Sequence, residues 1–397
     1  MKNFVADRMK NVRESVIRNI SEAAAKRPSI ISLANGNPSA EIFPAKKLAS
    51  IAQKVLSENP VMAHYGFTLG YPALREALKG RLASKYKIDF TRNELAIVSG
   101  GTQGCDIISR IFINEGDAII TEEPSYGSFF NDFHAYGAKL IGVPVGEKGI
   151  DVDRVEFELK SNRNVKMIYT IPTFANPTGF TASMETREAL YSLAHKYDVL
   201  IFEDDPYGEL RYKGVPVSPI KSMDTDGRVL YLGSLSKTIS PSFRLGYVVF
   251  DKAYEPVLNI AKQISEAGSN APLQYVAAEY INSRDYDDHI AECCETYGRK
   301  GTLMMNNIRE KMHPSIKTSS PEGGFFVMMF LPEGHSGVKF VWDAMDRGVA
   351  CVPGSGFMID QEAPNRMVRL CYSTPTDDEI NRGMAILGQL SHEVLDK

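Results

Sequence analysis

Short runs of apolar residues, many of them β-branched, recur along the first two thirds of the chain, and each run ends in small or polar residues. Such near-continuous apolar runs are typical of strands buried on both faces, as in a sheet covered by helices. Helical spacing lies between several runs, with leucines four apart in 71–86 and an apolar stripe in 181–197. The expected strands are 95–98, 118–121, 140–145, 165–171, 199–202, 229–232 and 245–250.

The alternation of strand and helix predicts an α/β domain with a mostly parallel, seven-stranded sheet. One connection departs from this pattern. The stretch 233–244 contains Pro241, carries no helical stripe and is barely long enough for a crossover. We therefore expect the strand at 245–250 to run antiparallel to its neighbours.

The pattern changes toward the C-terminus, where helical spacing covers 274–282 and 286–311. Strand-like runs follow at 324–330, 349–352 and 367–372, with a last helix from Thr376 onward, which predicts a second, smaller α+β unit. The expected organisation is an N-terminal segment (1–43) packing on the small unit and the functional site, a large domain (44–285) and a small domain (286–397).

Composition narrows the class of protein. The formal net charge of −4 gives no electrostatic footprint for nucleic acid or an anionic membrane, and no apolar run is long enough to span a bilayer. The five cysteines are odd in number and lack Cys-x-x-Cys spacing, which favours a reducing, cytoplasmic location. None of the seven histidines pairs with another His, a Cys or a Glu at metal-ligand spacing, so we expect no metal site.

Two glycine-containing motifs follow predicted strands, at the edge where open α/β sheets bind ligands. Residues 99–104 read Ser-Gly-Gly-Thr-Gln-Gly before a helix expected to start near Cys105, and free amides at a helix start suit a phosphate. Residues 171–179 contain Asn176-Pro177 and would leave an amide free to donate into a cleft. Taken singly, each motif is explained better as an ordinary turn.

Two charged motifs lie at the same predicted edge. Asp204, Asp205 and Tyr207 follow a buried strand, where carboxylates need a cation or a donor, although a helix cap would also explain them. Lys237 lies among serines with Arg244 seven positions later, which suits an amine nucleophile beside an anion-binding fork. A solvated loop lysine is the alternative.

Together these motifs place a phosphate cradle, an amide, an Asp, a Tyr, a Lys and an Arg at one sheet edge. The sequence resembles the fold-type I pyridoxal 5′-phosphate (PLP) enzymes of the class I/II aminotransferase family, most closely the 2-aminoadipate and kynurenine aminotransferase branch. The resemblance runs in family order over nearly the whole chain. It also includes 30–38, 65–75, 123–126, 321–324, 352–354 and Arg369.

The resemblance implies a role for each matching residue. Lys237 would be the Schiff-base lysine that moves a proton at the substrate Cα, which requires a lowered pKa. Asp204 would face the pyridine nitrogen, because the family's aspartate precedes the tyrosine by three positions. The other cofactor-binding residues implied are Gly101, Thr102, Gln103, Ser234, Ser236 and Arg244 at the phosphate, Tyr207 and Asn176 at the phenolic oxygen, and Tyr126 on the ring face.

For the substrate, the resemblance assigns Arg369 to the α-carboxylate, with Gly36 and Asn176 beside it. Tyr65 matches a tyrosine that reaches the phosphate of the neighbouring subunit, which implies a homodimer with shared sites. Asn35-Gly36-Asn37 and Phe325-Phe326 depart from the branch's usual residues near the substrate pocket, so the substrate stays open.

The resemblance therefore predicts a PLP-dependent aminotransferase that transfers an amino group from an L-amino acid to a 2-oxo acid by a ping-pong mechanism. The expected 2-oxo acid is 2-oxoglutarate. A PLP-dependent β-lyase would use the same Lys237 and Asp204, and a non-enzymatic PLP-binding regulator is a third hypothesis, although such regulators add a DNA-binding domain before the core. Arg8, Arg13 and Arg18 are expected in an N-terminal helix, where Arg18 would meet a distal substrate carboxylate or simply solvent.

Overall fold

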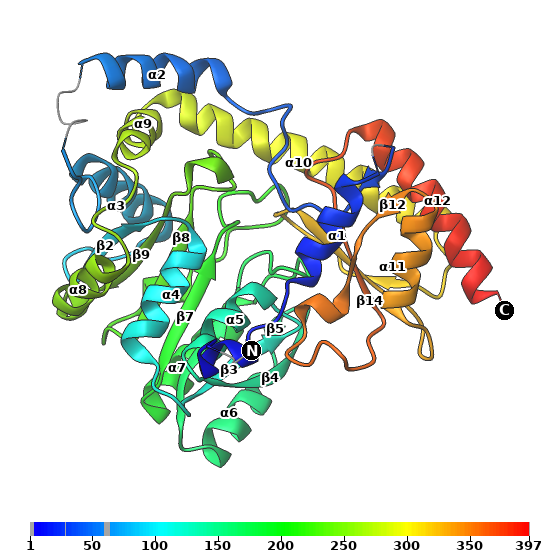
Figure 1. Cartoon of the computed structure of the whole chain (residues 1–397), viewed down its shortest axis with the longest axis horizontal. Coiled ribbons are helices and arrows are strands. Elements are labelled where there is room, and N and C mark those ends of the chain that lie inside the picture. The colour runs from blue at the N-terminus through cyan, green and yellow to red at the C-terminus, as the bar shows by residue number, and fades with distance from the viewer. Residues whose placement is uncertain (1–3, 28, 59–63, 397) are drawn as a thin grey trace.

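A computed structural model describes residues 4–27, 29–58 and 64–396, which form a large and a small unit side by side (Figure 1). The helices are α1 (Val16–Ala25), α2 (Ala45–Glu58), α3 (Pro72–Tyr86), α4 (Gly101–Phe112), α5 (Gly127–Ala135), α6 (Val152–Ser161), α7 (Met184–Tyr197), α8 (Glu255–Ser265), α9 (Ala271–Ile281), α10 (Arg284–Lys311), α11 (Gly337–Asp346) and α12 (Asp377–Leu395). The strands are β1 (Ile31–Ser32), β2 (Asn93–Val98), β3 (Ala118–Glu123), β4 (Lys139–Gly146), β5 (Gly149–Ile150), β6 (Val165–Thr170), β7 (Leu200–Asp205), β8 (Val229–Ser234), β9 (Gly246–Asp251), β10 (Lys317–Thr318), β11 (Phe326–Phe330), β12 (Val349–Ala350), β13 (Val352–Pro353) and β14 (Met367–Cys371).

The large sheet has the strand order β2-β9-β8-β7-β6-β3-β4-β5. All seven expected strands are present, and β9 pairs antiparallel with both β8 and β2, which confirms the prediction from the short 233–244 connection. The sheet gains one strand beyond the seven, because β5 pairs antiparallel with the end of β4. A strand of two residues carries no apolar run, so the sequence pattern could not reveal it.

Helices cover both faces of this sheet, as the doubly apolar strands required. Along β2, Leu95 and Ile97 pack with α2, α3 and α9, whereas Ala96 and Val98 pack with α4, α5 and α8 on the opposite face. Toward the other end of the sheet, α6 and α7 cover Ile168 and its neighbours. This sandwich leaves the strand ends as the places where polar side chains can gather.

The small unit is built on a four-stranded sheet in the order β10-β11-β14-β13. The single strand expected at 349–352 is two strands: β12 pairs with β1 of the N-terminal segment, and β13 pairs with β14. Cys351 stands between them, where the chain passes from one sheet to the other. The long helix α10 contributes to both cores, with Tyr286 in the large unit and Met304 in the small one, so the boundary expected at 285/286 falls near its start and stays a prediction.

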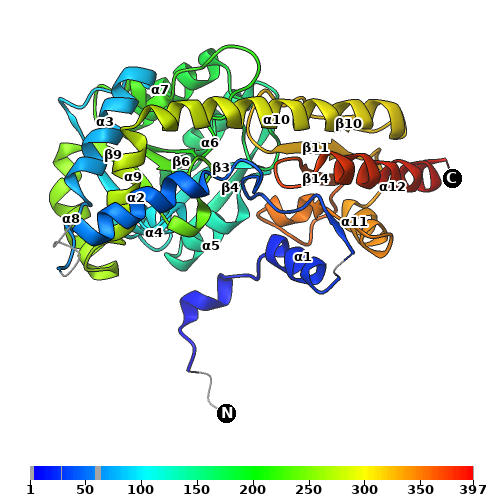
Figure 2. The same cartoon turned by 90° about the horizontal axis from the view of Figure 1, so that it is seen from above.

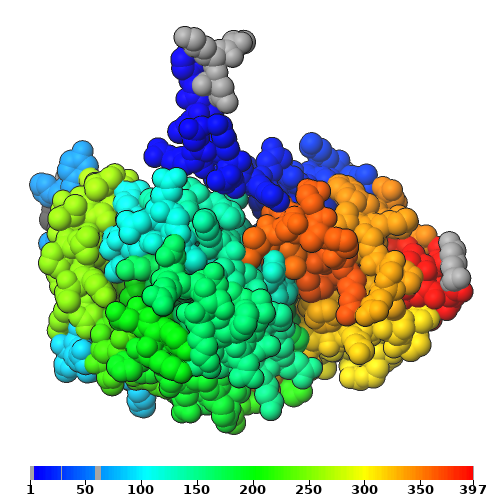
Figure 3. Space-filling view, turned by 90° about the horizontal axis from the view of Figure 1, so that it is seen from below, coloured from blue at the N-terminus to red at the C-terminus, as the bar shows by residue number. Residues whose placement is uncertain are grey.

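The N-terminal segment joins both units. Helix α1 buries Ile20 and Ala24 in the core of the small unit, while the chain before it projects from the face that carries α5 (Figures 2 and 3). Arg8, Arg13 and Arg18 do not share one helix as expected, because extended backbone at Val12 separates a 3-10 turn from α1.

None of the helices formed by the described residues combines the length and the apolar character needed to cross a membrane. The five cysteines are all unpaired, and every one except Cys294 is fully buried.

Candidate active site

The predicted site residues meet at one edge of the large sheet. Asp204 lies at the carboxyl end of β7 and Ser234 at that of β8, with Lys237 in the loop that follows. Arg244 reaches the same edge from the opposite chain direction, because it precedes β9 and β9 is antiparallel to β8. The reversed strand is therefore what brings the lysine and the arginine together.

A cavity of about 720 Å³ opens at this edge, within the range of small-molecule sites. The N-terminal segment and the small unit close it from the other side, through Gly36 and Arg369. The predicted residues that line it are Gly36, Gly101, Thr102, Tyr126, Asn176, Asp204, Tyr207, Ser234, Ser236, Lys237, Arg244 and Arg369.

Two predicted site residues do not line the cavity of the single chain. The side-chain oxygen of Gln103 accepts a hydrogen bond from the Ser99 N–H at 2.6 Å, so this side chain is used within the loop. Tyr65 is 91% exposed and stands apart from the cavity, so its assignment to a neighbouring subunit's phosphate stays a prediction.

The helix after the glycine-rich loop begins earlier than expected, because α4 starts at Gly101 rather than near Cys105. The residue before it, Gly100, adopts φ +88° and offers no side chain to cap the first amides. A Cβ at Gly100 would lie 2.2 Å from the Arg244 guanidinium, so only glycine allows that approach. The arginine donates to the Ser99 carbonyl at 3.2 Å. An uncapped helix start beside a guanidinium is suited to a phosphate.

Lys237 is held at the junction of the two units. Its Nζ donates to the Gly36 carbonyl at 2.8 Å and lies 5.9 Å from the centre of the Tyr207 ring. Burial lowers the pKa of Lys237 to about 8, and the positive charges of Arg369 and Arg244 act in the same direction. The pKa is therefore shifted in the direction that a proton-transferring amine requires.

The neighbouring carboxylates of β7 serve different faces of the sheet. Asp204 lines the cavity and accepts a hydrogen bond from the Tyr169 hydroxyl at 3.2 Å, whereas Asp205 accepts one from Tyr231 at 2.9 Å on the other face. Burial raises the pKa of Asp204 to about 8, with the Tyr169 hydrogen bond opposing the shift. Because burial disfavours the ionised form of this carboxylate, a cationic hydrogen-bond donor in the cavity would stabilise that form.

Arg369 is buried on β14 and faces the large unit. Its guanidinium donates to Asn176 Oδ1 at 2.9 Å and to the Ala34 carbonyl at 2.6 Å, and it stacks on Phe326 at 4.2 Å from the ring centre. Its Nε is buried without a hydrogen-bond partner among the described residues. Because Asn176 accepts through its oxygen, its amide N–H groups remain to donate elsewhere.

The cavity matches a phosphorylated, cationic aromatic ring in its chemistry. The uncapped start of α4 and Arg244 suit the phosphate, and the buried Asp204 suits a ring N–H. Tyr126 stands at the wall beside Phe129, with the two ring centres 5.2 Å apart, and offers a flat face. Lys237 lines the same cavity as Arg244, Asp204 and Tyr126.

Sequence reasoning missed Tyr169, which orients Asp204 from within β6. A tyrosine inside an apolar strand looks like an ordinary core residue, and only the pairing of β6 with β7 brings it to the aspartate. Ser21 was also missed; at the cavity its hydroxyl donates to Oδ1 of Asn35, a residue that was expected near the substrate pocket, at 2.8 Å. Arg18 lines the cavity too, but its Nε donates to Glu22 at 2.9 Å.

Known proteins resemble this chain along its full length. The family model for aminotransferase class I and II matches residues 28–387. Aromatic-amino-acid aminotransferase 1 of Thermococcus litoralis is 36% identical over 399 residues, which cover 99% of this chain and 95% of that protein.

Solved structures agree with this match. A kynurenine aminotransferase of Pyrococcus horikoshii, crystallised with PMP, has a TM-score of 0.94 at 35% identity and covers 99% of this chain and 98% of its own. The α-aminoadipate aminotransferase of Thermus thermophilus, complexed with N-(5′-phosphopyridoxyl)-L-leucine, has a TM-score of 0.89 at 28% identity with the same coverage.

Proposed function

Since this chain belongs to the aminotransferase class I and II family, whose cofactor is PLP, we propose that it transfers an amino group from an L-amino acid to 2-oxoglutarate. The two half-reactions would use one site in turn, as a ping-pong mechanism requires. The observation that carries this proposal is the cavity shared by Lys237, Asp204 and Arg369. It brings together an amine that can transfer a proton, a carboxylate that can pair with the cofactor ring and a guanidinium that can bind a substrate carboxylate.

We further propose that two copies of the chain form a homodimer. The exposed side chains of Tyr65 and Phe67 support this. A monomeric mass in light scattering would contradict it.

When bound, PLP supplies an aromatic ring that accepts the electrons of the substrate Cα–H bond and carries the amino group between half-reactions. We propose that Thr102, Ser234, Ser236 and Arg244 hold its phosphate together with the amides of Gly101 and its neighbours. This is supported by the uncapped start of α4 and by the approach of Arg244 that Gly100 allows.

Around the ring, we assign Asp204 to the ring nitrogen and Tyr207 and Asn176 to the phenolic oxygen, with Tyr126 against one face. The free amide N–H groups of Asn176 support its assignment as a donor. Burial raises the pKa of Tyr207 well above its ordinary value, so its hydroxyl stays protonated and can donate.

We assign Lys237 to holding the cofactor and to moving the proton at the substrate Cα. With its pKa lowered to about 8, a useful fraction of the amine is neutral near physiological pH and can accept that proton. Arg369 would bind the substrate α-carboxylate with the N–H groups that Asn176 and Ala34 do not use, and so aim the Cα at Lys237.

A panel of amino donors and 2-oxo acids tests the proposed reaction directly. Purified, PLP-loaded protein is mixed with aromatic, acidic and aliphatic donors plus 2-oxoglutarate, and glutamate and the new 2-oxo acid are quantified. Stoichiometric formation of both products is expected. Release of pyruvate and ammonia from a cysteine conjugate without glutamate would favour the β-lyase, and no turnover with any donor would contradict the proposal.

Replacing Tyr169 with phenylalanine tests the assignment of Asp204. Losing the hydroxyl removes the one hydrogen bond that favours ionised Asp204, so its pairing with the ring nitrogen weakens. A hydrogen bond of about 1 kcal/mol predicts PLP affinity roughly 5-fold lower, measured by equilibrium titration. The matched control is Tyr231→Phe, which removes the equivalent bond to Asp205 on the other face and should leave PLP affinity nearly unchanged. Equal losses in the two variants would argue against Asp204.

The lowered pKa of Lys237 predicts the pH dependence of cofactor loading. The neutral amine is the reactive form, so the rate of PLP uptake should rise from pH 6 and level off above its pKa of about 8. Stopped-flow absorbance gives the rate, and PLP addition to a free lysine derivative in the same buffers corrects for titration of PLP itself. A rate that keeps climbing through the ordinary lysine range would show that burial does not lower this pKa.

A further inference from the structure

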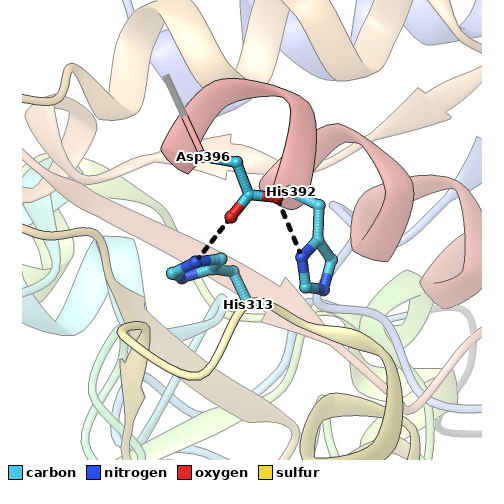
Figure 4. A group of neighbouring side chains, drawn as sticks. All are labelled: His313, His392 and Asp396. Atoms are coloured by element: carbon cyan, nitrogen blue, oxygen red, sulfur yellow. Dashed lines mark ion pairs between the residues drawn. The ribbon is translucent and has the colours of Figure 1, made fainter.

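Three potential metal ligands meet at the outer end of the small unit, away from the cavity (Figure 4). His392 lies in the last turn of α12, Asp396 follows directly after the end of that helix, and His313 comes from the loop between α10 and β10. Figure 4 shows the Asp396 carboxylate between the two imidazole rings, with one oxygen toward each. Sequence spacing did not reveal the group, since His313 is distant along the chain and the expectation of no metal considered only His, Cys and Glu partners.

The distances match those of a metal centre. Asp396 Oδ1 lies 3.2 Å from His313 Nε2, and Oδ2 lies 3.4 Å from His392 Nδ1. One ligand atom from each residue falls within 4.8 Å of the others. Ligands at about 2.0–2.2 Å from a tetrahedral zinc ion are roughly 3.4 Å apart. Each histidine already lies at such a distance from one Asp396 oxygen, but the two oxygens differ, so side-chain rotations are needed to bring one ligand atom of each residue around a single ion. We propose that His313, His392 and Asp396 bind a zinc ion.

Hydrogen bonds with Ser391 and Ser315 already hold His313 in place as a metal ligand. Its main-chain N–H donates to Ser391 Oγ at 2.9 Å, which ties the loop to α12 beside His392. Its Nδ1 lies 2.7 Å from Ser315 Oγ, so Nδ1–H can donate there and leave the Nε2 lone pair for the metal. The Ser315 main-chain N–H also lies 3.2 Å from Nδ1, which suits the other tautomer, with Nε2–H donating to Asp396. Metal binding would replace that proton.

The ligand set selects the class of ion. Two imidazoles and one carboxylate suit zinc and its transition-metal neighbours, whereas calcium and magnesium prefer oxygen ligands throughout. The side chains of His313, His392 and Asp396 are 18%, 47% and 62% exposed, so water can complete the coordination. Such an ion would join the end of α12 to the end of α10 and thereby stabilise the small unit, without a part in catalysis.

The test uses full-length, PLP-loaded protein that has been stripped of metal by a chelator. Zinc is titrated against a chromogenic chelator, and thermal unfolding is followed with and without zinc. We expect one zinc per chain at micromolar concentration and a higher unfolding temperature with zinc. In His313→Gln and in His392→Gln, zinc affinity should fall at least 10-fold, and the rise in unfolding temperature should disappear at the same zinc concentration. Ser315→Ala should weaken zinc binding about 10-fold.

The matched control is His335→Gln, which changes a half-buried histidine of the same unit whose ring Nδ1 lies 3.2 Å from the Glu333 carbonyl. It should keep both zinc binding and the thermal shift, and transaminase turnover should be the same in every variant. Zinc binding that survives unchanged in the His313 and His392 variants would place the ion elsewhere. Absence of saturable binding would mean that Asp396 simply accepts hydrogen bonds from the two histidines. Either result overturns the proposal and leaves the proposed function untouched.

Discussion

Replacing Lys237 with alanine is expected to lower kcat/KM for transamination by at least about 1000-fold, because proton transfer at the substrate Cα loses its base. The phosphate and ring contacts proposed for Arg244 and Asp204 do not involve this amine, so PLP should still bind. Lys237→Arg should lose as much activity as Lys237→Ala, since a guanidinium keeps the charge and does not give up its proton near neutral pH. Steady-state kinetics and PLP titration measure the two effects separately.

Mass spectrometry supplies an independent readout for the same residue. Borohydride reduction of the loaded wild-type protein should add the mass of the cofactor to the peptide that contains Lys237. The peptide of Lys221 provides the comparison, because that lysine is fully buried but pairs with Asp224 outside the cavity. Activity above a tenth of wild type in Lys237→Ala, or label on another lysine, would refute the assignment.

Replacing Arg369 with alanine is expected to lower kcat/KM for amino acids roughly 30- to 5000-fold, which corresponds to the 2–5 kcal/mol lost when one partner of a buried charge pair is removed. Arg369→Lys should fall between this variant and wild type, because an ammonium keeps the charge but cannot form the bidentate fork. The loss should appear for amino acids and not for the corresponding primary amines, which lack the α-carboxylate. Rates with an amino acid and its decarboxylated amine measure this contrast.

Arg366→Lys serves as the matched control for Arg369, since Arg366 precedes the same strand but is exposed and donates to the Leu331 carbonyl. It should leave both substrates unaffected. If Arg369→Ala slowed the amine as much as the amino acid, the arginine would act by holding Asn176 and Ala34 in place and not by binding the carboxylate.

The fold of the large unit was predictable because its strands are buried on both faces, which gives continuous apolar runs, whereas its helices are buried on one face only, which gives an apolar stripe. The apolar runs located all seven main strands, and the short 233–244 connection predicted the direction of β9. The errors fell where local pattern is weak. The two-residue β5, the division of 349–352 into β12 and β13, and the break at Val12 each depend on which partner a short segment meets in space.

The site was predictable to the extent that parallel strands bring their carboxyl ends to one edge. The sequence could not distinguish Asp204 from Asp205 by physics alone, and the resemblance made that choice. The pleat supplies the physical reason, because adjacent residues of β7 point to opposite faces and only Asp204 lines the cavity. Gln103 and Tyr65 illustrate the limit, since the side chain of the first is used within its loop and the second stands apart from the cavity.

The amino-acid sequence by itself determined the family, the order of elements and the residue types available for chemistry, because periodicity and local motifs are properties of neighbouring positions. The tertiary structure alone decided which distant groups meet: Gly36 with Lys237, Asn176 with Arg369, Tyr169 with Asp204, and His313 with the end of α12. These contacts arise from the pairing of strands and the packing of two units, which no local pattern records. The lowered pKa of Lys237 has the same origin, since it comes from burial between those units.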